Sequence, residues 1–167
     1  NNPETGTIAS IPNGVTMTGG KLLAKSGQIN LVSVSSPGEI AATNFSPSTN
    51  IHMGNISLSQ GTILDVSGNA AGTIMIRGGQ LIISEATISA DTIDADGAPA
   101  AVDINIARDM SISNEFVPAI TARTTGSGNA GTISIVAASM TVATDSTVGA
   151  ELAMIDSHTA GSGGAGK

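Results

Sequence analysis

Acidic side chains are the groups in this sequence whose number and spacing best suit chemistry. The 167-residue chain has 13 Asp and Glu against six Lys and Arg, and it has no cysteine. Glycosidases need two carboxylates held roughly 5 to 10 Å apart, and one stretch supplies several candidates: Asp91, Asp94, Asp103, Asp109 and Glu115. Such clefts usually add aromatic and basic side chains, whereas this chain has no Trp, no Tyr and two Phe. A polysaccharide-active enzyme is therefore kept as an alternative, and no catalytic residue is assigned.

A second acidic motif, Asp94-Ala-Asp96-Gly97, has the spacing that opens a calcium loop. A complete loop carries further oxygen ligands and a Glu at its twelfth position. Here Ala98 and Pro99 follow instead, so the motif predicts a surface turn. We expect neither a metal nor a cofactor to bind this chain.

Asp156-Ser157-His158 contains the three residue types of a hydrolytic triad. A triad is defined by its geometry in space, and three neighbours in one strand or loop do not adopt that geometry. The other histidine, His52, has no acidic residue near it in the sequence. We therefore expect both histidines to be solvated loop residues, and we expect that the chain is not an enzyme.

The charge balance argues against two classes of partner. The formal net charge is −7, and the few basic residues form no cluster. Nucleic-acid binding needs grouped cations that neutralise phosphates, so no nucleic-acid partner is expected. Membrane insertion is not expected either, because no apolar stretch approaches the roughly 18 to 20 residues that span a bilayer.

An irregular repeat dominates the sequence, and it must position whatever chemistry the chain has. Gly72-Thr-Ile-Met-Ile76 returns as Gly131-Thr-Ile-Ser-Ile135. Two further apolar pairs follow each copy at similar distances: Leu81/Ile83 and Ile88/Ala90 after the first, Met140/Val142 and Val148/Ala150 after the second. The unit therefore contains three short apolar-x-apolar segments.

Weaker copies of the unit open at Gly14, Gly27, Gly54 and Ala101, which gives six unit openings in all. The Gly27 copy would take its next apolar pair from a distant segment that contains Ile40. The irregular spacing falls in segments rich in Gly, Ser and Pro, which are typical of loops.

The apolar residues of every pair lie two positions apart, which is the period of a β-strand, and no helical stripe competes with it. Three short strands bent at small residues trace a triangular coil, and such coils stack by parallel pairing at roughly 4.8 Å. The pattern predicts an all-β parallel β-helix of about six irregular coils that spans residues 1–167 as one segment, with an irregular lead-in at 1–13. Asn69 and Asn129, at matching turns, could then form a stacked amide ladder.

A β-sandwich is the competing fold, because short strands and frequent turns fit it as well. A sandwich does not require one motif to return along the chain, and it usually buries aromatic side chains. The repeat and the scarcity of aromatic residues both favour the β-helix.

Five short motifs follow one another in a specific order, at residues 27–39, 54–59, 64–69, 76–81 and 126–135. Their order resembles that in the filamentous haemagglutinin-like exoproteins of two-partner secretion, and the resemblance covers nearly the whole chain from about residue 14. It implies a right-handed parallel β-helix, export through an outer-membrane transporter, and display on or release from the cell. Members of that family are mostly adhesins, and some are cytolysins.

The secretion domain of that family carries an Asn-Pro-Asn-Gly signal near its N-terminus. Ile11-Pro-Asn-Gly14 matches three of these four residues, and the surrounding domain is absent. The resemblance therefore implies the rod that follows the secretion domain.

These observations lead us to expect a secreted structural rod at the bacterial cell surface or in the extracellular space, as an adhesin shaft or a filament or matrix component. The expected partners are further copies or a continuation of the same rod, with cell-surface or matrix polysaccharide as a candidate ligand. A polysaccharide-active β-helix enzyme and a cytolysin-like exoprotein are the alternatives.

Overall fold

The computed structural model describes most of the chain: residues 5–8, 14–42, 44–45, 47–48, 50–70, 72–114, 117–143 and 155–166. Over these residues the regular structure is entirely β, with fifteen strands and no helix. None of the described segments forms a helix of the length and apolar character that crossing a bilayer requires.

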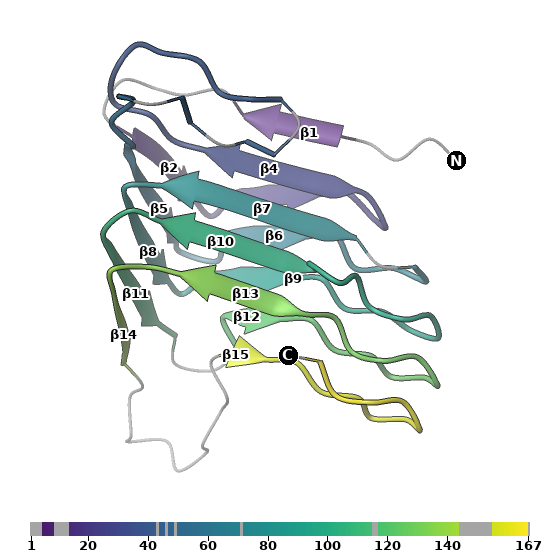
Figure 1. The fold of residues 1–167 in the computed structure, drawn as a ribbon. Coiled ribbons are helices and arrows are strands. Elements are labelled where there is room, and N and C mark those ends of the chain that lie inside the picture. The colour runs from purple at the N-terminus through teal and green to yellow at the C-terminus, as the bar shows by residue number, and fades with distance from the viewer. Residues whose placement is uncertain are drawn as a thin grey trace.

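The strands form three parallel sheets (Figure 1). The first sheet contains β1 (Thr5–Ile8), β4 (Gln28–Val32), β7 (Thr73–Gly78), β10 (Val102–Ile106) and β13 (Ile133–Val136). The second contains β2 (Gly14–Thr18), β5 (Asn55–Ser59), β8 (Gln80–Ser84), β11 (Asp109–Ser113) and β14 (Ser139–Ala143). The third contains β3 (Lys21–Leu23), β6 (Ile63–Asp65), β9 (Thr87–Ser89), β12 (Ile120–Thr121) and β15 (Ile155–Asp156).

Each sheet takes every third strand of the chain, so the chain visits the three sheets in turn and then returns to the first. All the ladders between these strands are parallel, which confirms the expected all-β solenoid. A β-sandwich would instead be built from antiparallel sheets. We call one strand from each sheet a turn of the solenoid.

The core is a set of aliphatic ladders, because alternate residues of every strand point inward. In the first sheet, Leu31, Ile76 and Ile104 lie in register and are fully buried. The second and third sheets contribute equivalent rows, which include Leu58, Leu81, Ile83, Leu64 and Ile88. Burying each such side chain stabilises the fold by roughly 1.5 to 3 kcal/mol. The interior is therefore narrow and layered, and it needs no aromatic residue.

Two of the six expected unit openings are wrong. Gly27, Gly72 and Gly131 do precede strands of the first sheet, whereas Gly14 is in register with Asn55 at the start of second-sheet strands. Gly54 thus introduces the second strand of a turn, because first-sheet and second-sheet strands share the same apolar alternation. The described strands make five per sheet, against the six or so coils that the sequence suggested.

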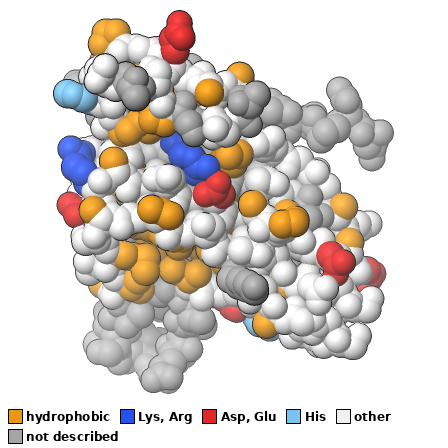
Figure 2. All heavy atoms as spheres, in the orientation of Figure 1, with side chains coloured by type: hydrophobic (Ala, Val, Ile, Leu, Met, Phe, Trp, Pro, Cys, Tyr) orange, Lys and Arg blue, Asp and Glu red, His pale blue; other side chains and the backbone are white. Residues whose placement is uncertain are grey.

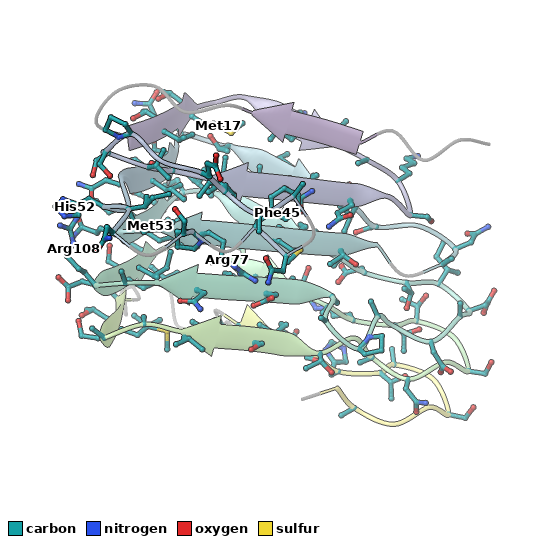
Figure 3. The ribbon with its side chains drawn as sticks, turned by 45° about the horizontal axis from the view of Figure 1, so that its top comes forward. Met17, Phe45, His52, Met53, Arg77 and Arg108 are labelled. Atoms are coloured by element: carbon teal, nitrogen blue, oxygen red, sulfur yellow. The ribbon has the colours of Figure 1, made fainter. Side chains whose placement is uncertain are left out.

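An arm of 20 residues, 34–53, leaves the solenoid between β4 and β5 and closes on itself through the antiparallel bridges Val34↔Met53 and Ile40↔Pro47. Ile40 therefore lies in the arm and supplies no strand of the solenoid, contrary to expectation. Figure 3 labels Phe45, His52 and Met53 of this segment. The arm explains why the register step from Gln28 to Thr73 is 45 residues, while that from Ile74 to Val102 is 28.

The first strand differs from expectation in a smaller way. β1 lies inside the segment 1–13, where the sequence suggested an irregular lead-in, and it pairs in parallel with β4.

Candidate functional site

The carboxylates that suggested glycosidase chemistry lie apart in the fold. Asp103 is on the outer face of the first sheet, paired with Arg77, and Asp109 is on the second sheet, where it accepts a hydrogen bond from Ser139. Asp91 follows the third-sheet strand β9, and Asp94 lies in the loop beyond it. Glu115 is outside the described residues. The four described carboxylates thus occupy three sheets or their loops and do not converge in one cleft.

The acidic motif around Asp94 and Asp96 connects neighbouring loops through hydrogen bonds to Asp96. Asp96 Oδ1 accepts hydrogen bonds from the backbone and side-chain nitrogens of Asn129, and Asn129 Oδ1 accepts one from the Gly164 N–H. The amide ladder expected between Asn69 and Asn129 is therefore absent, because the loop that carries Asp96 separates them. Within the described ranges no three His, Cys, Asp or Glu side chains are grouped to hold a metal ion.

The three side chains of the Asp156-Ser157-His158 motif make separate contacts, and Asp156 is the last residue of β15. Asp156 Oδ1 lies 2.8 Å from His158 Nδ1, and its Oδ2 accepts a 2.8 Å hydrogen bond from Arg123 Nε. The Ser157 hydroxyl donates to the Gly131 carbonyl oxygen at 2.6 Å, so it is bound away from the histidine. His158 is exposed, as expected, yet it is held by Asp156. The arrangement is an ion-pair cluster in which the serine hydroxyl contacts a backbone carbonyl.

The environment of Asp156 favours its ionised form. Burial raises the pKa of this carboxyl, but the hydrogen bond from His158 and the charge of Arg123 lower it by more. The net pKa of Asp156 is therefore below the usual value of an aspartate.

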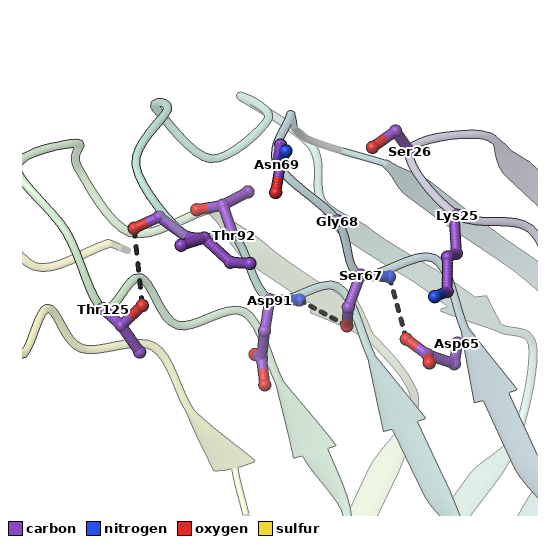
Figure 4. Close-up of a pocket in the computed structure, with 10 residues that line it drawn as sticks. Lys25, Ser26, Asp65, Ser67, Gly68, Asn69, Asp91, Thr92 and Thr125 are labelled. Carbon is purple, nitrogen blue, oxygen red and sulfur yellow. Dashed lines mark hydrogen bonds between the residues drawn. The ribbon is translucent and has the colours of Figure 1, made fainter. Parts of the chain in front are cut away.

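A groove lies on the outer surface where the third sheet gives way to the loops that return to the first sheet (Figure 4). Its volume is about 830 Å³, and its lining combines charged, hydroxyl, amide and aliphatic groups: Lys25, Ser26, Asp65, Ser67, Gly68, Asn69, Asp91, Thr92, Ile93 and Thr125. This groove is the candidate functional site.

The groove follows the stacking of the turns. Parallel bridges join Gly68 to Thr92 and Thr92 to Thr124, which extends the third sheet into the loops. Positions one residue further on, such as Asn69, Ile93 and Thr125, are therefore brought into one row along the groove. Asn69 is thus next to a position occupied by Ile93, which is the second reason that it has no amide neighbour.

A ladder of hydrogen bonds fixes the floor of the groove. The Ser67 N–H donates to Asp65 Oδ1 at 2.8 Å, and the Asp91 N–H donates to the Ser67 hydroxyl at 3.0 Å. The Arg123 N–H then donates to Asp91 Oδ1 at 2.8 Å. We call Asp65, Ser67, Asp91, Arg123 and Asp156 the polar ladder, since Arg123 continues it to Asp156.

The lining can donate and accept hydrogen bonds, and it carries both signs of charge. Lys25 supplies a cation, while Asp65 and Asp91 supply carboxylates. Ile93 adds an aliphatic surface that is half exposed. This combination of groups can bind a polar ligand through hydrogen bonds and through contact with Ile93.

Sequence reasoning missed both the groove and the polar ladder. A signal was present, because Ser67, Asp91 and Arg123 each follow a small or apolar residue just after a third-sheet strand. Recognising it requires the register of the turns, and the misplaced openings at Gly14 and Gly54 obscured that register.

No protein family, no curated protein and no solved structure matches this chain.

Proposed function

We propose that this chain is a segment of a secreted rod that acts at the bacterial cell surface, as an adhesin shaft or a component of an extracellular filament. The observation that carries the proposal is the stack of three continuous parallel sheets around an aliphatic core. Such a stack satisfies its backbone hydrogen bonds from turn to turn and grows in one direction. A rod of this kind is suited to projecting a binding surface away from the cell.

The outer faces support this role because they repeat. On the second sheet, one outward row in register is almost entirely hydroxyl: Thr16, Ser57, Ile82, Ser111 and Thr141. Repeated weak contacts along one body add to a strong attachment without any single tight site. The resemblance to two-partner secretion exoproteins supports export through an outer-membrane transporter.

We further propose that the solenoid is right-handed. Connections between parallel strands of one sheet are right-handed in about 98% of cases, because strand twist favours that hand. One strand from each sheet then makes one turn, and the described strands supply five turns.

The last described turn exposes apolar side chains that a further turn of the same kind could cover. On β14, Met140 and Val142 occupy inward positions in register with Met110 and Ile112, yet they are 49% and 42% exposed. Figure 2 shows hydrophobic side chains gathered at the lower left of the face drawn, where β13 turns into β14. Another turn, from the same chain or from a second copy, would cover these side chains.

Immunolabelling of intact cells of the producing bacterium tests the surface location. An antibody against this chain should label unpermeabilised cells or their extracellular filaments. Labelling that requires permeabilisation would contradict the proposal. Electron microscopy of purified material should show elongated particles, and short isolated particles of uniform size would count against a rod.

The two alternatives gain less from the structure. A polysaccharide-active enzyme was expected to bring the carboxylates of 91–115 into one groove, and Asp91 alone of the four described ones lines it. A cytolysin needs contiguous apolar surface. The apolar cluster at β13 and β14, which includes Met140 and Val142, would be covered by a further turn, and other exposed apolar residues such as Leu23, Ile93 and Val117 lie in separate segments. Leakage from liposomes at neutral pH is the direct test of the second alternative.

A further inference from the structure

We propose that the groove beside the third sheet binds an uncharged, hydroxyl-rich glycan chain that lies along the axis of the solenoid. This proposal depends on the proposed function in one respect, because an extracellular rod is the setting in which the chain would meet such a polymer. It assigns the binding to the groove lining alone.

The direction of the groove favours a linear polymer. Its lining residues come from four successive turns, with Lys25 after β3, Ser67 after β6, Asp91 after β9 and Thr125 after β12. Three strand spacings of about 4.8 Å give a run of roughly 14 Å along the axis. A chain lying in this direction can contact side chains of all four turns, whereas a compact ligand would use fewer of them.

Hydrogen bonds within the polar ladder orient the carboxylates so that they can accept hydrogen bonds from the hydroxyl groups of a ligand. Asp65 and Asp91 each accept one backbone N–H at 2.8 Å, which orients the carboxylate and leaves its second oxygen for a ligand. Hydrogen bonds to ionised acceptors are about twice as strong as neutral ones. Sugar hydroxyls donate and accept, so they also suit the exposed amide of Asn69 and the ammonium of Lys25.

The charges of the groove select against anionic polymers. An anionic chain is repelled by Asp65, Asp91 and the net charge of −7, whereas Lys25 offers one cation. An uncharged chain satisfies both kinds of group at once. The aliphatic surface of Ile93, which is 50% exposed, gives the C–H faces of sugar rings an apolar contact in place of an aromatic one.

Binding to immobilised polysaccharides tests the proposal. Biolayer interferometry at physiological ionic strength would compare neutral probes (xyloglucan, mannan and hydroxyethyl cellulose) with anionic polygalacturonate. The wild-type chain should bind at least one neutral probe and should not bind polygalacturonate. The double substitution Asn69→Ala with Ile93→Ser should weaken that binding about tenfold or more. Thermal unfolding followed by circular dichroism should show both chains folded.

The matched control is Asp109→Asn, which changes a carboxylate of the second sheet, away from the groove, and should leave binding unchanged. Binding to polygalacturonate alone, no binding to any neutral probe, or equal binding by the folded double variant would each overturn the proposal. Surface labelling of intact cells is independent of these results, so loss of the groove proposal and loss of the rod proposal are distinguishable.

Discussion

The third and fifth turns of the solenoid carry the same inward pattern and reach very different degrees of burial. Leu81 and Ile83 of β8 are fully buried, while Met140 and Val142 at equivalent positions of β14 are almost half exposed. The strands have the same length, and their apolar alternation is the same. The difference lies in the neighbours, since β8 is paired on both sides and β14 pairs with β11 among the described strands. A turn therefore has no core of its own, and its stability comes from the turns next to it.

The largest expected effect comes from shortening one inward-facing side chain in each of these two turns. Ile83→Ala should destabilise the protein by about 2 to 5 kcal/mol, because it leaves a cavity between Leu58 and Ile112. Val142→Ala should cost less than about 1 kcal/mol, because its side chain is already partly in solvent. Urea unfolding followed by circular dichroism measures both, and equal costs would refute the explanation by neighbours.

A second test concerns the backbone contact between the loops of neighbouring turns. A Cβ atom added at Gly128 would lie 2.2 Å from the carbonyl oxygen of Ala95, which belongs to the loop of the preceding turn. Gly128→Ala should therefore push the loops apart and cost about 1 to 3 kcal/mol. Gly20→Ala is the control, since its Cβ would meet the flexible end of Met17 at 3.3 Å. If both variants unfold at the wild-type temperature, the contact between the loops does not contribute to the stability of the stacked turns.

The pH dependence of the last turn gives a smaller effect. Asp156 has a pKa below its usual value of 3.8, so its pairing with Arg123 and His158 stabilises the fold at pH values above that figure. The contribution is lost as the pH falls through the lower folded-state pKa. Asp156→Asn should reduce stability at neutral pH by less than about 1 kcal/mol, and the difference from wild type should vanish in strong acid. Melting curves at both pH values measure it, and a difference that grew in acid would contradict the assignment.

The smallest expected effect is that of removing the arm. The arm is closed by its own hydrogen bonds, such as Ser35 N–H to His52 O and Ser48 N–H to Glu39 O. Replacing residues 36–51 by a short Gly-Ser turn should change the unfolding free energy by less than about 1 kcal/mol, because closure entropy varies slowly with loop length. Hydrogen exchange would show whether β7 and β8 keep their protection, and loss of it would mean that the arm supports the middle turns.

The sequence alone predicts the fold class well, because Leu31, Ile76 and Ile104 belong to strands that alternate plainly and no aromatic core is available. The frame of the repeat is harder to predict, since Gly14 and Gly54 precede the same alternation as Gly72 although they open second-sheet strands. The arm was equally hidden, because Ile40 continues an apolar pattern while lying outside the stack.

The groove could not be predicted from the sequence for a related reason. Ser67, Asp91 and Arg123 are 24 and 32 residues apart, and only the register of the turns makes them neighbours. The contact between Asp156 and His158 is local, because the two residues are only two positions apart in the chain. Sequence reasoning excluded a triad at this motif and did not consider the simpler ion pair.

The arm also shows how this architecture accommodates new material. The chain departs at Val34 and returns at Met53, and β4 and β5 still pair in register with β7 and β8 as if the insertion were absent. Residues inserted at this corner therefore leave the register of the stacked strands unchanged. An unrelated peptide or a small folded domain grafted between these two residues would be displayed at a fixed height on the side of the solenoid, which makes this corner a natural point for diversification and for engineering.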